Sequence, residues 1–147
     1  MLTCSKSYQD IPLSHRQPFH NGRCSRLHGH SWSITLTFAS DKLDSNGFVV
    51  DFGELHYISD WIDEHLDHGT IVCANDPMIE NIRSISKQGL LKIVEIESAS
   101  CEGIAIYLFH TFNGLVRKKT NNRAWLKKIH LMEDSKNSAT FEPQPDK

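Results

Sequence analysis

The strict alternation of polar and apolar residues over positions 31–39 limits most strongly what this chain can fold into. Trp32, Ile34, Leu36 and Phe38 fall on one side of an extended chain, and serines and threonines fall on the other. A period of two is typical of a strand with one face on a core and one face toward solvent. The chain therefore needs a sheet with something packed over one of its faces.

Two other segments show the helical period and can supply that cover. The first is predicted to begin at Asp51, with Glu54 completing a capping box, and to end at Gly69. The second is predicted from about Cys101 to Phe112, where Asn113-Gly114 would close it. We expect both helices to pack on the same face of the sheet.

The remaining segments favour further strands and turns. We expect strands at 7–16, 90–96 and 124–132, a loop at 17–27, a turn at 45–47 leading into a hairpin partner at 48–50, and a short helix from Asp76-Pro77 to Gly89. The predicted fold class is α+β: an antiparallel sheet with two helices on one face. At 147 residues, we expect a single domain over 1–147, with 142–147 a frayed tail.

Composition excludes several classes of protein. Lys plus Arg is 16 and Asp plus Glu is 18, so the formal charge of −2 argues against a dedicated nucleic-acid binder. No apolar run approaches the ~18 residues that a membrane span needs. The first ten residues lack a secretory signal, and no cysteines form a C-x-x-C pair. We therefore expect a cytoplasmic protein with reduced thiols.

Histidines gather just before the alternating strand. If its register extends backward, His28 and His30 share the face of Trp32, with Gly29 between them allowing close approach of other backbone. A third imidazole would complete a zinc site with one open position, the pattern of catalytic zinc. His15 is the best candidate for this ligand, and His20 is its rival.

Three motifs occur together and in order: Cys24-Ser-Arg-Leu-His28-Gly-His30, Phe48-Val-Val-Asp51-Phe52, and Leu66-Asp67-His68. In this combination the chain resembles the 6-pyruvoyltetrahydropterin synthase superfamily, over about residues 7–141. Three residues separate the cysteine from H-G-H. This spacing resembles that of the carboxytetrahydropterin synthase subgroup, whereas a spacing of five residues is typical of the pyruvoyl-forming enzymes.

The resemblance implies roles for particular residues. The zinc ligands would be His15, His28 and His30; the catalytic residues would be Cys24, Asp67 and His68; the substrate-binding residues would be Glu133 and Glu102. Glu80, in Pro77-Met78-Ile79-Glu80-Asn81, competes with Glu102 for the family's helix-start glutamate. Departures from the family pattern are Ile11-Pro12-Leu13-Ser14 before the first ligand and Ala99-Ser100 in place of Pro-Thr.

The resemblance also implies an activity and an assembly. The reaction would convert 7,8-dihydroneopterin triphosphate into 6-carboxytetrahydropterin, acetaldehyde and triphosphate, in queuosine and 7-deazaguanine biosynthesis. Two alternatives stay open: a 6-pyruvoyltetrahydropterin synthase, and a non-catalytic relative that binds zinc or pterin. The implied fold is the T-fold, assembled as a hexameric barrel with active sites between subunits; open sheet edges give a physical reason to pair.

Overall fold

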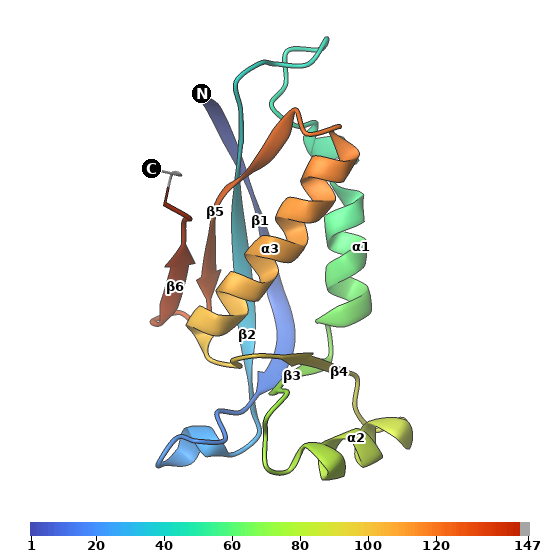
Figure 1. The fold of residues 1–147 in the computed structure, drawn as a ribbon, viewed down its shortest axis with the longest axis vertical. Helices are drawn as coiled ribbons and strands as arrows, with labels where there is room; N and C mark the ends of the chain where they lie inside the picture. Colours follow the sequence, from blue (N-terminus) through green and yellow to red (C-terminus); the bar gives the residue numbers. More distant parts are fainter. Residues whose placement is uncertain (145–147) are drawn as a thin grey trace.

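The computed structural model describes residues 1–144 and shows one sheet with helices on one of its faces (Figure 1). The strands are β1 (Leu2–His15), β2 (His28–Ser40), β3 (Gly69–Cys73), β4 (Ile93–Ile96), β5 (Ala124–Met132) and β6 (Ser138–Phe141). The helices are α1 (His56–His65), α2 (Ile79–Lys87) and α3 (Cys101–Lys119), with short 3₁₀ turns at Arg23–Ser25 and Phe52–Glu54. The strand order is β4-β3-β1-β2-β5-β6.

The two longest strands, β1 and β2, form the centre of the sheet. They pair antiparallel, with His15 opposite His28 and Leu13 opposite His30. The register shifts between Tyr8 and Ile11, where an irregularity bends the pair. The loop that joins the two strands therefore leaves and re-enters the sheet at the same end, next to the histidines.

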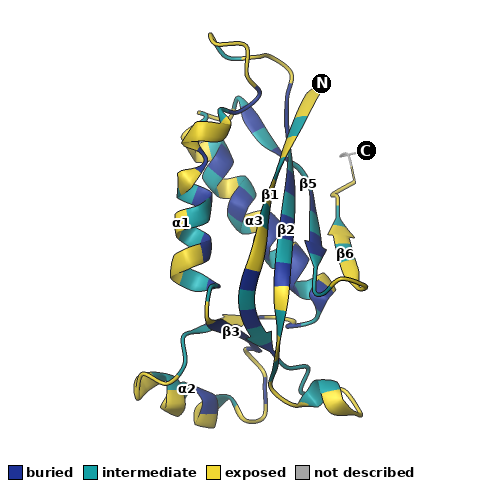
Figure 2. Ribbon diagram, turned by 180° about the vertical axis from the view of Figure 1, so that it is seen from behind, coloured by how far each residue is buried: buried dark blue, intermediate teal, exposed yellow. Residues whose placement is uncertain are grey.

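Helices α1 and α3 cover one face of this sheet, and their inward sides are buried (Figure 2). The alternation over 31–39 is confirmed, because Trp32, Ile34, Leu36 and Phe38 are buried under the helices. Trp32 also keeps its polar atom satisfied, since its Nε1 donates to the Leu13 carbonyl at 2.9 Å. The predicted α+β class with two helices on one face is thus correct.

The prediction of a purely antiparallel sheet is wrong in part. Strand β3 runs parallel to β1, and β4 runs parallel to β3, so the sheet is mixed. All five residues of β3 are buried, which removes the alternation that marks a half-exposed strand. For this reason periodicity did not reveal it. The structure describes a single chain, so the hexameric barrel expected of a T-fold stays a prediction.

The expected hairpin partner at 48–50 is also wrong. No strand forms there, because the carbonyl groups that would join a ladder are used otherwise: Arg123 donates to the carbonyls of Lys42, Phe48 and Val49. The Asp44 side chain accepts from the backbone N–H of Phe48 and closes the turn. A side chain from the far end of the chain, beyond any local pattern, decides this segment.

Helix α1 is shorter than predicted at both ends, and α3 is longer than predicted at one. Helix α1 ends at His65, and Gly69, the predicted stop, is the first residue of β3. Asp51 does accept from a backbone N–H, that of Gly53, but it opens a 3₁₀ turn, and α1 begins only at His56. Helix α3 continues through Asn113-Gly114 to Lys119. The positive-φ residues that follow it are Asn121 and Asn122, so they provide the stop signal expected at Gly114.

Alanine substitutions at the two glycines of α3 are expected to change the stability of the fold in opposite directions. A Cβ at Gly103 would meet the Ser98 carbonyl oxygen at 2.3 Å, whereas one at Gly114 would meet nothing within 4 Å. We expect Gly103→Ala to destabilise the fold by about 1–3 kcal/mol through overpacking. We expect Gly114→Ala to stabilise it by about 0.5–1 kcal/mol, because alanine lowers the entropy of the unfolded chain. Urea unfolding measures both, and equal signs would contradict this packing.

The chain end contains a strand that was not expected, β6, which pairs with β5. Residues 142–144 follow it without helix or strand and are exposed, whereas 145–147 of the expected frayed tail lie outside the described residues. Within residues 1–144, no helix combines the length and the apolar character that crossing a membrane requires.

Candidate metal centre and active site

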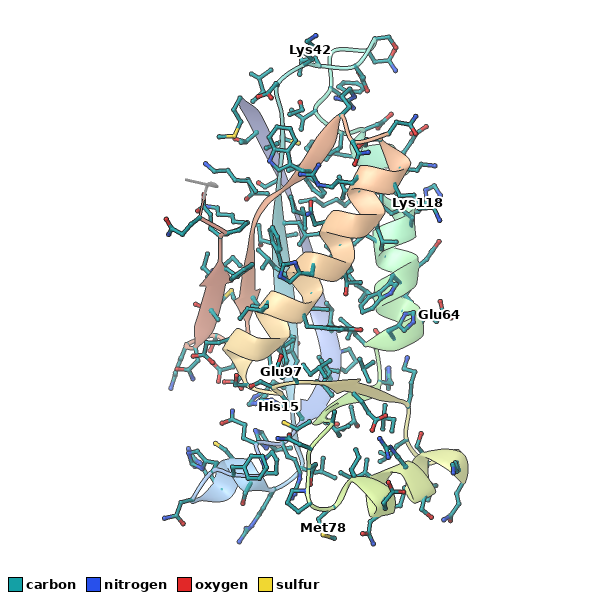
Figure 3. All side chains as sticks on the ribbon, in the orientation of Figure 1. His15, Lys42, Glu64, Met78, Glu97 and Lys118 are labelled. Carbon is teal, nitrogen blue, oxygen red and sulfur yellow. The ribbon has the colours of Figure 1, made fainter. Side chains whose placement is uncertain are left out.

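Three imidazoles lie close together in the structure. The first of them, His15, is labelled in Figure 3 at the end of the sheet where α3 begins. One ring nitrogen from each of His15, His28 and His30 lies within 4.8 Å of the other two. The strand pairing explains this, because His15 and His28 are direct neighbours across β1 and β2, and His30 is two residues further along the same face. The group is of the size that holds a metal ion; His20, the rival ligand, is not part of it.

Backbone carbonyls orient two of these rings. Nδ1 of His15 lies 2.7 Å from the carbonyl oxygen of Ala99, and Nδ1 of His28 lies 2.7 Å from that of Arg26. A carbonyl only accepts, so each Nδ1 carries the proton and donates it. The Nε2 atoms of neutral rings then keep their lone pairs, which is the tautomer that a metal ligand needs.

A carboxylate lies next to two of the Nε2 atoms. Oε1 of Glu133 lies 3.1 Å from Nε2 of His15 and 3.4 Å from Nε2 of His30, yet neither nitrogen makes a hydrogen bond, although both are buried. Buried polar atoms are normally partnered, so each exception needs an explanation. The lone pair of His15 Nε2 and a carboxylate oxygen at this distance repel one another unless a proton or a metal cation lies between them.

A metal ion therefore fits the residues present. Burial lowers the pKa of His15 below its ordinary value and favours the neutral ring, which can act as a ligand. Three imidazole nitrogens with a carboxylate beside them are donors typical of zinc. Glu133, expected as a pterin anchor after β5, is thus placed directly against the candidate metal centre.

Cys24 lies in the 3₁₀ turn of the loop between His15 and His28, and it is half-buried. The other three cysteines are poorer candidates for a reactive thiolate. Cys73 and Cys101 are buried, and burial raises the pKa of Cys101 to about 12 and also raises that of Cys4. Cys24 is the remaining thiol, on the loop that joins His15 to His28.

Asp67 and His68 lie apart from the three imidazoles. They connect α1 to β3, where His68 adopts a positive φ of 56° and its backbone N–H donates to the Pro12 carbonyl. Nδ1 of His68 contacts a carboxylate oxygen of Asp67, and the His68 side chain is 84% exposed. The pair is oriented as an acid–base pair would be, and its His68 ring is open to solvent.

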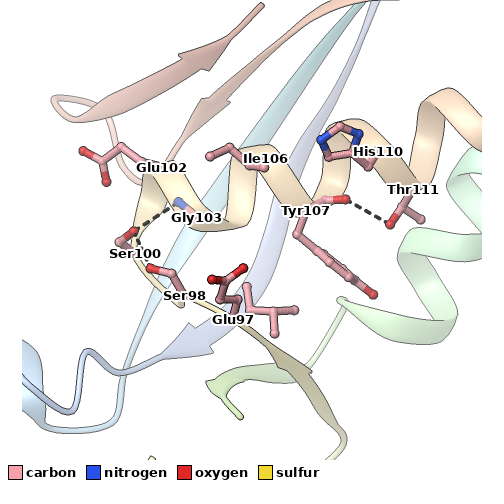
Figure 4. Close-up of a pocket in the computed structure, with 10 residues that line it drawn as sticks. Glu97, Ser98, Ser100, Glu102, Gly103, Ile106, Tyr107, His110 and Thr111 are labelled. Carbon is pink, nitrogen blue, oxygen red and sulfur yellow. Dashed lines mark hydrogen bonds between the residues drawn. The ribbon is translucent and has the colours of Figure 1, made fainter. Parts of the chain in front are cut away.

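The two candidate glutamates differ in their surroundings. Glu102 lies in the first turn of α3, at the edge of a groove of about 800 Å³ along the outer side of that helix (Figure 4). Glu80 is instead paired with Arg83, which also binds Glu95. The choice of Glu102 over Glu80 as the helix-start glutamate stays a prediction.

Sequence reasoning missed the groups that orient the ligands, which are the carbonyls of Ala99 and Arg26. Every residue carries a carbonyl, so no residue type could have marked them.

Comparisons with known proteins found a matching family model and several relatives. The family model described as 6-pyruvoyl tetrahydropterin synthase matches residues 3–144. A 6-carboxy-5,6,7,8-tetrahydropterin synthase from Rickettsia typhi is 33% identical over 110 residues, covering 74% of this chain and 78% of the relative. One from Aquifex aeolicus is 32% identical over 89 residues, covering 59% and 55%.

Solved structures share the fold. An uncharacterised protein from Wolinella succinogenes superposes with a TM-score of 0.81 at 18% identity, covering 97% of this chain and 98% of that one. A 6-pyruvoyl tetrahydropterin synthase from Plasmodium vivax superposes with a TM-score of 0.66 at 19% identity, covering 99% and 100%. At such identities the likeness concerns the fold alone.

Proposed function

The chain belongs to the 6-pyruvoyl tetrahydropterin synthase family, and from that premise we propose that it is a zinc-dependent 6-carboxy-5,6,7,8-tetrahydropterin synthase. Its substrate is then 7,8-dihydroneopterin triphosphate, and its products are 6-carboxytetrahydropterin, acetaldehyde and triphosphate. The relatives named for this activity align over most of the chain at about a third identity. The three-residue spacing between Cys24 and His28 points to the same subgroup.

The observation that carries the proposal is the group of three imidazoles, in which Nε2 of His15 and Nε2 of His30 are buried without a hydrogen-bond partner. His15, His28 and His30 would hold zinc through Nε2, because the Nδ1 protons of His15 and His28 are given to carbonyls. When bound, zinc supplies a Lewis acid that polarises oxygens of the substrate side chain and lowers the pKa of neighbouring groups.

Proton transfer falls to this chain's own side chains. Cys24 lies in the loop that leads into the ligand strand, and its thiolate is the base that would remove a proton from the substrate side chain. Cys24 is the candidate because the loop that carries it joins two of the three proposed ligands, His15 and His28.

The pterin ring needs a carboxylate that accepts two N–H bonds from its 2-amino-pyrimidinone edge. Glu133 is our candidate, because its carboxylate lies at the imidazole group and is only 17% exposed. Glu102, at the start of α3, is the second candidate. A ring held by Glu133 would place its side chain against the metal centre.

Asp67 and His68 are proposed to serve the site of a neighbouring subunit in a hexamer. His68 is exposed and lies outside the imidazole group, yet Asp67 orients its ring for proton transfer. A group that is fixed but unpartnered within its own chain suits an active site shared between subunits.

Product analysis tests the function directly. We expect zinc-loaded protein to convert 7,8-dihydroneopterin triphosphate into 6-carboxytetrahydropterin and acetaldehyde, which mass spectrometry identifies. A chelator should stop the reaction, and added zinc should restore it. A 6-pyruvoyl product would point to the other synthase, and no turnover with intact zinc binding would point to the non-catalytic relative; either result would refute the proposal.

A further inference from the structure

A buried ion pair connects the metal-binding end of β1 to a segment that carries none of the candidate site residues. Arg16 follows His15 directly, and Asp76 lies between β3 and α2. Nε and Nη2 of Arg16 donate to the two carboxylate oxygens of Asp76 at 2.6 and 2.7 Å. The side chain of Asp76 is 0% exposed and that of Arg16 is 18% exposed, so the paired fork is shielded from water.

The same guanidinium also holds the loop between β1 and β2. Nη1 of Arg16 donates to the carbonyl of Ser25 at 2.9 Å. Ser25 follows Cys24, and the next residue, Arg26, offers the carbonyl that orients His28. Within residues 1–144, the other hydrogen bonds of 17–27 stay inside the loop or reach His28. Arg16 is thus the side chain that ties this loop to a distant segment.

A second contact, from the last residue of β3, supports His15, the first of the candidate ligands. Sγ of Cys73 accepts from the backbone N–H of Ala99 at 3.3 Å, and the carbonyl of Ala99 accepts from His15 at 2.7 Å. The backbone N–H of Asp76 donates to the carbonyl of Cys73 at 3.0 Å, which joins the two supports. Residues 73–76 therefore stand behind both His15 and the loop.

We propose that Arg16 and Asp76 are positioning residues that hold the Cys24 loop and the His28 ring in place at the metal centre. Because a guanidinium is planar and rigid, fixing two of its donors on Asp76 aims the third at the Ser25 carbonyl. The inference rests on the proposed function for the role of Cys24. It also assigns a task to the connection between β3 and α2, which none of the sequence motifs explained.

Two conservative variants test the pair, and a third serves as control. Arg16→Lys keeps the charge opposite Asp76 but loses the fork, so we expect it to fold. Asp76→Asn keeps the size and the oxygen that accepts from the Met78 N–H. The control, Arg83→Lys, changes another paired arginine nearby; its side chain is 39% exposed and its partners are Glu80 and Glu95.

The first readout is zinc affinity, measured by competition with a chromophoric chelator. We expect Arg16→Lys and Asp76→Asn to weaken zinc binding by about 10- to 100-fold, as losing the support of a ligand typically does, and Arg83→Lys to leave it unchanged. Hydrogen exchange should accelerate in residues 17–27 and stay slow in α3. A merely structural pair would lower the unfolding temperature without changing the zinc affinity of the folded protein.

The second readout is turnover. We expect kcat to fall by about 10- to 100-fold with KM nearly unchanged, because the loop positions the base and not the substrate. If folded Arg16→Lys binds zinc and exchanges its loop amides like the unaltered protein, the positioning role is refuted. Zinc binding and exchange need no substrate, so they decide this inference even if the unaltered protein gives no 6-carboxytetrahydropterin, which would refute the proposed function alone.

Discussion

Replacing His28 by alanine is expected to weaken zinc binding by about 10²- to 10³-fold. Zinc sites with four protein ligands bind with roughly 10–16 kcal/mol, so the share of one ligand is about 2.5–4 kcal/mol. His28 is suited to this test because it is only half-buried, so its removal leaves the core under α1 and α3 intact. Turnover should fall with zinc occupancy at limiting metal. Competition titration and metal analysis after dialysis measure the two effects.

His56→Ala is the matched control for this prediction. His56 is an exposed histidine at the start of α1 and is not part of the imidazole group. The His56→Ala variant should bind zinc like the unaltered protein. If His28→Ala retained full affinity, the three rings would not form the metal site, and the proposed function would lose its main support.

Replacing Cys24 by alanine is expected to lower kcat by about 10²- to 10⁴-fold, the usual contribution of a positioned acid or base. Zinc affinity should not change, because the three nitrogens that would hold the metal are untouched. Steady-state kinetics on zinc-saturated protein give kcat, and the zinc titration confirms that the site is loaded. The combination separates loss of the base from loss of the metal.

Cys4→Ala provides the control for the thiol. Cys4 lies near the beginning of β1, at the opposite end from His15, and burial raises its pKa. This substitution should leave kcat unchanged. Full turnover of zinc-loaded Cys24→Ala would show that another group removes the proton, and the assignment of the base would be wrong.

Much of the candidate site could be predicted from the sequence because its residues lie on two strands that pair. The alternation from Trp32 backward placed His28 and His30 on the covered face, and the structure agrees. The predicted pairing of His15 with them follows from the register of β1 and β2. These are consequences of a two-residue period, which the chain itself carries.

Other features depend on contacts between distant segments. Strand β3 is buried on both faces and shows no alternation, and Arg123 takes the carbonyls that a hairpin at 48–50 would have used. Similarly, α3 continues past Gly114, because packing against the sheet outweighs a local stop signal.

Sequence patterns alone were enough to propose the candidate site residues and to place His28 and His30 on one face of β2, because residue type and period are local properties. The contacts that hold these side chains in place depend on how the chain folds in three dimensions. The carbonyl of Ala99 behind His15, the carboxylate of Glu133 against the free nitrogens, and the bridge from Asp76 through Arg16 join segments far apart in the chain. Such contacts arise from packing in three dimensions, and no local pattern records them.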